Sequence, residues 1–186
     1  MVVMKSTRTL KTKLELRENK ENDTIKIVGY ALKFNRKSED LGYIETIDPK
    51  ALGNTDMSNV VALINHDQNY VLGRTGHNLD LEVDEIGLKF TLTPVRTSYV
   101  NDLLENMRMG LIDKCSFAFT VSEDGDYWEE KDGKWYRTIQ SINKLYDVSV
   151  VTSPAYEDTE AVLSERSLDD VKRKRDIAIM EMELEI

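Results

Sequence analysis

Two histidines are the first candidates for a general base in this chain, because histidine is the side chain that ordinarily changes charge near neutral pH. His66 follows the apolar residues 60–64 and stands between Asn65 and Asp67, as expected at the end of a buried strand. His77 lies in a stretch rich in glycine and polar residues, which predicts a turn. This context favours His66, although a lone histidine is more often a surface or structural residue.

A nucleophile needs an oxygen or sulfur on a rigid element, with a base within hydrogen-bond reach. Ser116 meets the first condition, since it lies in an alternating stretch soon after Gly110 and faces away from Phe117 and Phe119. Its neighbour Cys115 is the stronger nucleophile as a thiolate, but alternation places it on the phenylalanine face, where a small buried cysteine is common. Serine alone is weak evidence, because most strand serines take no part in catalysis.

Asp147 stands in the β-branched run 145–151, where a carboxylate is costly unless it is paired or faces solvent. A buried carboxylate that accepts a histidine N–H could orient the base and stabilise the imidazolium. The alternative is an outward-facing strand aspartate.

A metal site is a second interpretation of the same region. His66, Asp67 and His77 carry imidazole and carboxylate groups that suit zinc or manganese, but they lack the tight spacing of familiar zinc motifs. The single cysteine excludes an intramolecular disulfide and cysteine-based metal clusters. We therefore expect no cofactor.

The elements that must position these residues are mainly strands. Residues 10–16 and 24–31 predict a hairpin around the polar residues 19–23, and residues 79–83 and 88–92 predict a second hairpin. A period of three to four from Val100 to Leu111 predicts a helix, capped by Thr97 or Ser98 and closed by Gly110. Strands are expected after Gly110 and over 145–151, with a polar turn over 123–133 between them.

A charged helix is predicted from Ser167, with only a thin apolar face. We therefore expect one β-rich domain over 1–165 and a docked or partner-bound C-terminal helix over 166–186.

Composition excludes several classes of protein. The 186 residues are 40% hydrophobic and carry a net charge of −9, so the chain can bury a core and its body repels nucleic acid. Basic residues gather mainly in the first twenty positions and at 172–175, which are small patches with acids among them. Apolar runs are too short for a membrane span, and the first residues do not resemble a secretory signal. These features predict a cytosolic protein that binds neither nucleic acid nor membrane.

Five segments in order resemble the prohead serine proteases of tailed bacteriophages and prophages, which are relatives of the herpesvirus assembly proteases. No single segment is specific, but together they extend from about residue 10 to 160. The segments are GYALKFN at 29–35, ETIDPKAL at 45–52, LINHD with LGR at 63–67 and 72–74, RMGL through CSFAF at 108–119, and LYDVSVVTSPA at 145–155.

The resemblance implies a fold and a set of roles. The fold would be α+β and mainly β, a small closed β-barrel surrounded by a few helices. His66 would be the general base, Ser116 the nucleophile and Asp147 the third member, with Asp67 as the rival for that third role. The oxyanion hole would come from backbone N–H groups in the region 152–156. Ala118 departs from the family pattern, which usually has glycine two residues after the serine.

The implied activity is that of a serine endopeptidase in phage prohead maturation. Its substrates would be the scaffold protein and the major capsid protein, with its own terminal tail as a further substrate, and weak self-association would switch it on. It would act in the host cytoplasm, inside the assembling prohead. The alternative is a non-catalytic capsid-assembly module that binds scaffold without cutting it.

Overall fold

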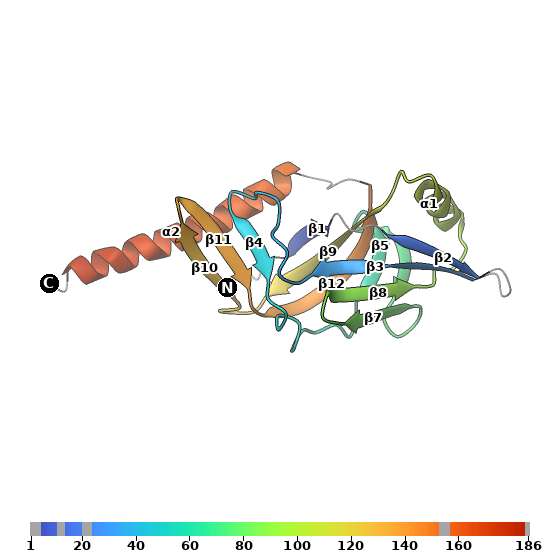
Figure 1. Ribbon diagram of the computed structural model, residues 1–186, viewed down its shortest axis with the longest axis horizontal. Helices are drawn as coiled ribbons and strands as arrows, with labels where there is room; N and C mark the ends of the chain where they lie inside the picture. The colour runs from blue at the N-terminus through green and yellow to red at the C-terminus, as the bar shows by residue number, and fades with distance from the viewer. Residues whose placement is uncertain (1–4, 11–13, 20–23, 153–156, 185–186) are drawn as a thin grey trace.

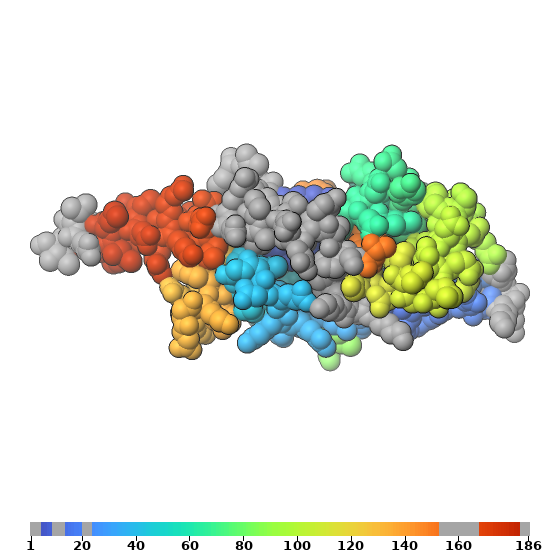
Figure 2. Space-filling view, turned by 90° about the horizontal axis from the view of Figure 1, so that it is seen from above, coloured from blue at the N-terminus to red at the C-terminus, as the bar shows by residue number. Residues whose placement is uncertain are grey.

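The computed structural model describes residues 5–10, 14–19, 24–152 and 157–184. Within these residues twelve strands form sheets of five, three and four strands, so the predicted mainly β class is confirmed. Two helices lie at opposite ends of the elongated molecule (Figures 1 and 2).

The five-stranded sheet, with strand order β1-β9-β12-β5-β6, carries Ser116 and Asp147 on its strands and His66 in the turn between β5 and β6. Its members are β1 (Ser6–Leu10), β9 (Lys114–Val121), β12 (Ile142–Val151), β5 (Val61–Ile64) and β6 (Asp67–Arg74). β9 and β12 lie in the middle of the sheet. β9 is buried except at its two ends and β12 is buried over its second half, so the polar side chains Ser116, Asp147 and Ser149 lie in a buried setting.

The four-stranded sheet packs against this one through contacts between β3 and β9 and has the order β2-β3-β8-β7. It contains β2 (Glu15–Asn19), β3 (Thr24–Lys33), β7 (Leu79–Val83) and β8 (Gly87–Leu92). The second predicted hairpin is confirmed, since β7 pairs with β8. The first is confirmed only in part, because β2, which pairs with β3, shares only residues 15–16 with the predicted strand, and residues 20–23 lie outside the described residues. The interpretation of residues 10–16 as one strand is wrong, because Leu10 ends β1 and Glu15 begins β2 in a different sheet.

The three-stranded sheet has the order β10-β11-β4 and contains β10 (Asp126–Lys131), β11 (Lys134–Ile139) and β4 (Ile44–Ile47). The predicted polar turn over 123–133 is therefore wrong. As an edge strand, β10 leaves much of its surface to solvent, so a polar sequence suffices. Trp128 anchors the strand edge-on against Tyr43, with 4.7 Å between the ring centroids.

The helices are α1 (Ser98–Arg108) and α2 (Glu157–Leu184). Thr97 caps α1 by accepting a hydrogen bond from the Val100 amide, and Gly110 follows with a positive φ of 71°, so the predicted helix is confirmed. α2 begins ten residues before the predicted start at Ser167. Residues 157–166 contain no glycine or proline to stop a helix, and six of them are glutamate, alanine, leucine or arginine, which favour it. The division into two units at residue 165 stays a prediction.

Neither helix has the length and apolar character needed to cross a bilayer, as far as the described residues extend.

The expected closed barrel is not confirmed. Within the described residues no sheet closes on itself, because β1 and β6 remain the separate edges of the five-stranded sheet. The hydrophobic core lies instead between packed open sheets, with Phe90, Phe117 and Phe119 among its fully buried side chains.

Candidate active site

His66 lies in the two-residue turn between β5 and β6. Ile64 pairs with Asp67 across this hairpin, and Asn65 and His66 have φ values of 52° and 59°. Positive φ at both central residues is what a tight type I′ turn requires, and asparagine adopts it more readily than most residues. The Asn65 amide donates to the Val150 carbonyl at 3.0 Å, and its side-chain oxygen accepts from the Thr152 amide at 3.2 Å. The turn is therefore fixed onto the end of β12.

Ser116 lies within β9, opposite Ser149 of β12 on one side and Thr9 of β1 on the other. Its Oγ is 2.6 Å from Nε2 of His66 and 3.0 Å from the carbonyl oxygen of Arg8. The residue is only 1% exposed, because it has strands on both sides.

Asp147 enters the site from β12. Its Oδ1 lies 2.5 Å from Nδ1 of His66 and accepts a hydrogen bond from the Ser149 hydroxyl at 2.9 Å. Its Oδ2 faces Nζ of Lys5 at 3.2 Å. Burial by itself raises the pKa of this carboxyl, but the hydrogen bond and charge of His66, with the charge of Lys5, lower the pKa by more. Asp147 is therefore held as a carboxylate.

The three side chains form a line from carboxylate to imidazole to hydroxyl. With Nδ1–H donated to Asp147, Nε2 is free to accept the Ser116 proton, and the carboxylate stabilises the imidazolium that results. This arrangement can support nucleophilic attack by a serine oxygen.

The rivals named from the sequence lie elsewhere. The Asp67 carboxylate accepts from the backbone and side-chain nitrogens of Asn69, at 2.9 and 2.8 Å, and so stabilises a turn. His77 is exposed in the turn after β6. The alternative metal site at His66, Asp67 and His77 is not assembled, because the described part of the chain holds no group of three or more potential metal ligands.

Cys115 is fully buried next to the site, on the core side of β9. Desolvation raises the pKa of its thiol to about 12, so almost no thiolate forms near neutral pH. This favours Ser116 over Cys115 as the nucleophile.

Sequence reasoning missed three contributors to the site. Ser149 shares a face of β12 with Asp147, and the alternation of a strand could have revealed this. Arg8 reaches the site from β1 and Lys5 from the residue just before that strand, and nothing in their local sequence signals these contacts. Of the suspected oxyanion-hole region, residues 153–156 lie outside the described residues.

Residues 12–174 match the family of caudovirus prohead serine proteases. The chain therefore belongs to this family of phage-encoded peptidases, which act in capsid maturation.

Among solved structures, the capsid assembly protease gp21 of bacteriophage T4 is similar, with a TM-score of 0.51 and 13% sequence identity. The similarity covers 81% of this chain and 99% of that chain, and at this identity it supports the fold alone. No curated protein sequence matches the chain significantly.

Proposed function

We propose that this protein is a serine endopeptidase of the Ser-His-Asp type that cleaves scaffold and capsid proteins in the phage prohead. The observation that carries the proposal is the contact of His66 with both Ser116 at 2.6 Å and Asp147 at 2.5 Å. Three residues from three separate segments of the chain converge in the order that acyl transfer requires.

The proposed reaction proceeds in two halves. Nε2 of His66 takes the Ser116 proton while Oγ bonds to a peptide carbonyl carbon, and the imidazolium then gives that proton to the leaving amine as the C–N bond breaks. In the second half the same imidazole takes a proton from water as the water oxygen bonds to the acyl carbon. The imidazolium then returns that proton to Oγ of Ser116 as the ester C–O bond breaks and the acid product leaves. Asp147 keeps Nδ1–H directed at itself throughout.

The substrates proposed are the scaffold protein and the major capsid protein, together with a terminal tail of this chain. Family membership supports this substrate class, and confinement in the assembling prohead in the host cytoplasm would restrict cleavage to assembly. Self-association inside that confined volume is the proposed switch. The mechanism requires no metal or cofactor, nucleic acid or membrane.

Co-expression with the neighbouring capsid and scaffold proteins tests the proposal. We expect discrete fragments, measured by intact mass, with the wild-type chain and none with Ser116→Ala, which removes only one oxygen. Ser122→Ala is the matched control, since Ser122 bonds to Ser141 away from the site and its loss should leave the fragments unchanged.

Two results would contradict the proposal. Fragments that persist with Ser116→Ala would exclude Ser116 as the nucleophile. Absence of fragments with the wild-type chain, in the presence of assembled shells, would favour the non-catalytic assembly module.

A further inference from the structure

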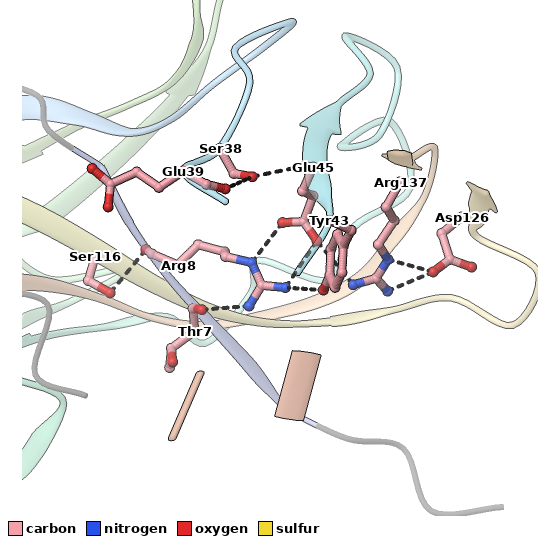
Figure 3. A network of polar contacts seen from close by, with 9 residues as sticks. All are labelled: Thr7, Arg8, Ser38, Glu39, Tyr43, Glu45, Ser116, Asp126 and Arg137. Carbon is pink, nitrogen blue, oxygen red and sulfur yellow. Dashed lines mark hydrogen bonds and ion pairs between the residues drawn. The ribbon is translucent and has the colours of Figure 1, made fainter. Parts of the chain in front are cut away.

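We infer that β1 occupies a peptide-binding subsite of the candidate active site, and that Glu45 makes this subsite selective for a substrate strand with a basic residue beside Ser116. The inference rests on the proposed function and specifies its substrate further. Figure 3 shows the contacts that link Ser116, Arg8 and Glu45.

β1 lies where an extended substrate would have to lie. It is one of the two edge strands of its sheet and, within the described residues, pairs with no strand other than β9, which contains Ser116. Addition of a peptide strand to a sheet edge is a common way to bind an extended chain. The family match begins at residue 12, so β1 lies outside the matched segment.

The N-terminal segment contacts two of the three candidate catalytic side chains. Nζ of Lys5 lies 3.2 Å from Asp147, and the Arg8 carbonyl accepts a hydrogen bond from Ser116 at 3.0 Å. The backbone carbonyl next to the Ser116 hydroxyl is thus that of Arg8. The side chain of the same residue therefore fills the subsite beside Ser116.

The contact with Arg8 also opposes catalysis. A hydroxyl has one proton, so Ser116 cannot donate to the Arg8 carbonyl and to Nε2 of His66 at once. Catalysis requires donation to His66. The Arg8 carbonyl therefore competes with His66 for the Ser116 proton, and β1 must leave the edge of β9 before a substrate strand can take its place.

The pocket for the Arg8 side chain is centred on Glu45. Nε and Nη2 of Arg8 donate to the two carboxylate oxygens of Glu45 at 2.7 and 3.0 Å, the paired geometry that suits a guanidinium. Nη2 also lies 3.4 Å from the Tyr43 hydroxyl, and the guanidinium lies 5.9 Å from the centre of the Phe119 ring. A cation with an apolar stem fits this surface.

Other residues keep Glu45 in place independently of Arg8. Nη1 of Arg137 donates to Glu45 at 3.0 Å, and Arg137 is itself held by Asp126 at 2.7 Å (Figure 3). The Glu45 amide donates to the Ser38 hydroxyl at 2.8 Å. The pocket is therefore built from β4 and the segment before it, from β9, and from β10 and β11, and β1 fills it.

The charges in the pocket require a cation. Glu45 and Asp126 supply two negative charges and Arg137 one positive charge, so one negative charge remains until Arg8 enters. Because Glu45 is only 3% exposed, water would compensate that charge poorly. A neutral or acidic side chain in place of Arg8 would leave it unpaired.

The test uses the full-length chain with Ser116→Ala, which prevents cleavage, combined with Arg8→Asp, which places a carboxylate against Glu45 and so expels β1. The probe is a fluorescent peptide with the sequence of residues 5–10, Lys-Ser-Thr-Arg-Thr-Leu, and the control peptide has neutral citrulline in place of arginine. Fluorescence polarisation measures binding. Arg8→Gln, which only removes the charge, is the milder second variant.

We expect the arginine peptide to bind the Arg8→Asp chain at least about tenfold more tightly than the citrulline peptide, because a buried charged hydrogen bond is lost. Binding to a chain that retains Arg8 should be weaker than to either variant, since the subsite is already filled. Adding Glu45→Gln should abolish the preference for arginine.

Equal binding of both peptides, or a folded Arg8→Asp chain that binds neither, would overturn the inference. A third result would also overturn it: the Arg8→Asp chain does not fold, and the Arg8→Gln chain folds but binds no peptide. β1 would then be an integral strand of the sheet and not the occupant of a subsite. The binding assay needs no nucleophile. Selective binding of the arginine peptide without fragments in the co-expression assay would refute the proposed protease activity and support the subsite. Fragments without selective binding would support the protease activity and refute the subsite.

Discussion

Nδ1 of His66 lies 2.5 Å from Oδ1 of Asp147, and this contact sets the orientation of the imidazole between β5 and β9. Ser149 supports it by donating to the same carboxylate oxygen at 2.9 Å. The base is thus oriented by a strand that lies between its own hairpin and the strand of the nucleophile.

Asp147→Asn should lower the rate of scaffold cleavage by about 10³- to 10⁴-fold, because an amide neither holds the required tautomer nor stabilises the imidazolium. The rate is measured from fragment mass against time, with circular dichroism to show that the fold is kept. Asp67→Asn is the matched control and should stay within a few fold of wild type, since Asp67 bonds only within its turn. A larger loss with Asp67→Asn would reverse the assignment of the third member.

Asn65→Val should destabilise the protein by about 1–3 kcal/mol, because a β-branched residue is strained at the φ of 52° found there. It also removes the oxygen that accepts the Thr152 amide. Urea unfolding measures the change. Asn65→Gly loses the same oxygen without the backbone strain and should be less destabilised, so equal effects of the two substitutions would contradict this account of the turn.

Cys115 should resist iodoacetamide in the native protein and react readily in urea, because burial raises the pKa of its thiol to about 12. Mass spectrometry of the alkylated chain measures both reactions. Cys115→Ala should retain cleavage of the scaffold. Loss of activity on native alkylation would instead place the thiol in the reaction.

Glu45→Gln should change how stability depends on pH. Burial by itself raises the pKa of Glu45, but the charges and hydrogen bonds of Arg8 and Arg137 lower it by more, so the folded-state pKa lies below that of the unfolded chain. The unfolded chain therefore binds the proton first as pH falls. The stabilisation is complete above the ordinary glutamate pKa of about 4.3 and is lost as pH falls through the depressed folded value.

We therefore expect the free energy of unfolding of Glu45→Gln to be lower than that of the wild type at pH 7. Below about pH 4 it should fall less steeply than that of the wild type, and the two slopes should differ by at most about 1.4 kcal/mol per pH unit. Urea titrations between pH 7 and pH 3 measure these slopes. The exposed Glu123→Gln is the control and should follow the wild-type curve. If the stability of Glu45→Gln and of the wild type depended on pH in the same way, protonation of Glu45 would not be coupled to folding, and this prediction would be wrong.

Local patterns were sufficient for several elements of the fold. The second predicted hairpin is β7 and β8, and the helix capped by Thr97 is α1, because alternation and capping act over a few residues. β10 was missed because its polar edge position depends on a partner strand, and β1 because its contacts are with residues far along the chain.

The sequence by itself determined a short set of candidate side chains, and the resemblance to the family chose the roles among them. The candidates are two histidines, Ser116 with its neighbour Cys115, and the carboxylates of Asp147 and Asp67. The properties that make them candidates are local, since they follow from residue type and the alternation of a strand. Only the tertiary structure brought His66, Ser116 and Asp147 together, separated Asp67 and His77 from them, and placed Arg8 between Ser116 and Glu45. These contacts join segments as many as 108 positions apart, and strand order and register, which no local pattern encodes, decide them.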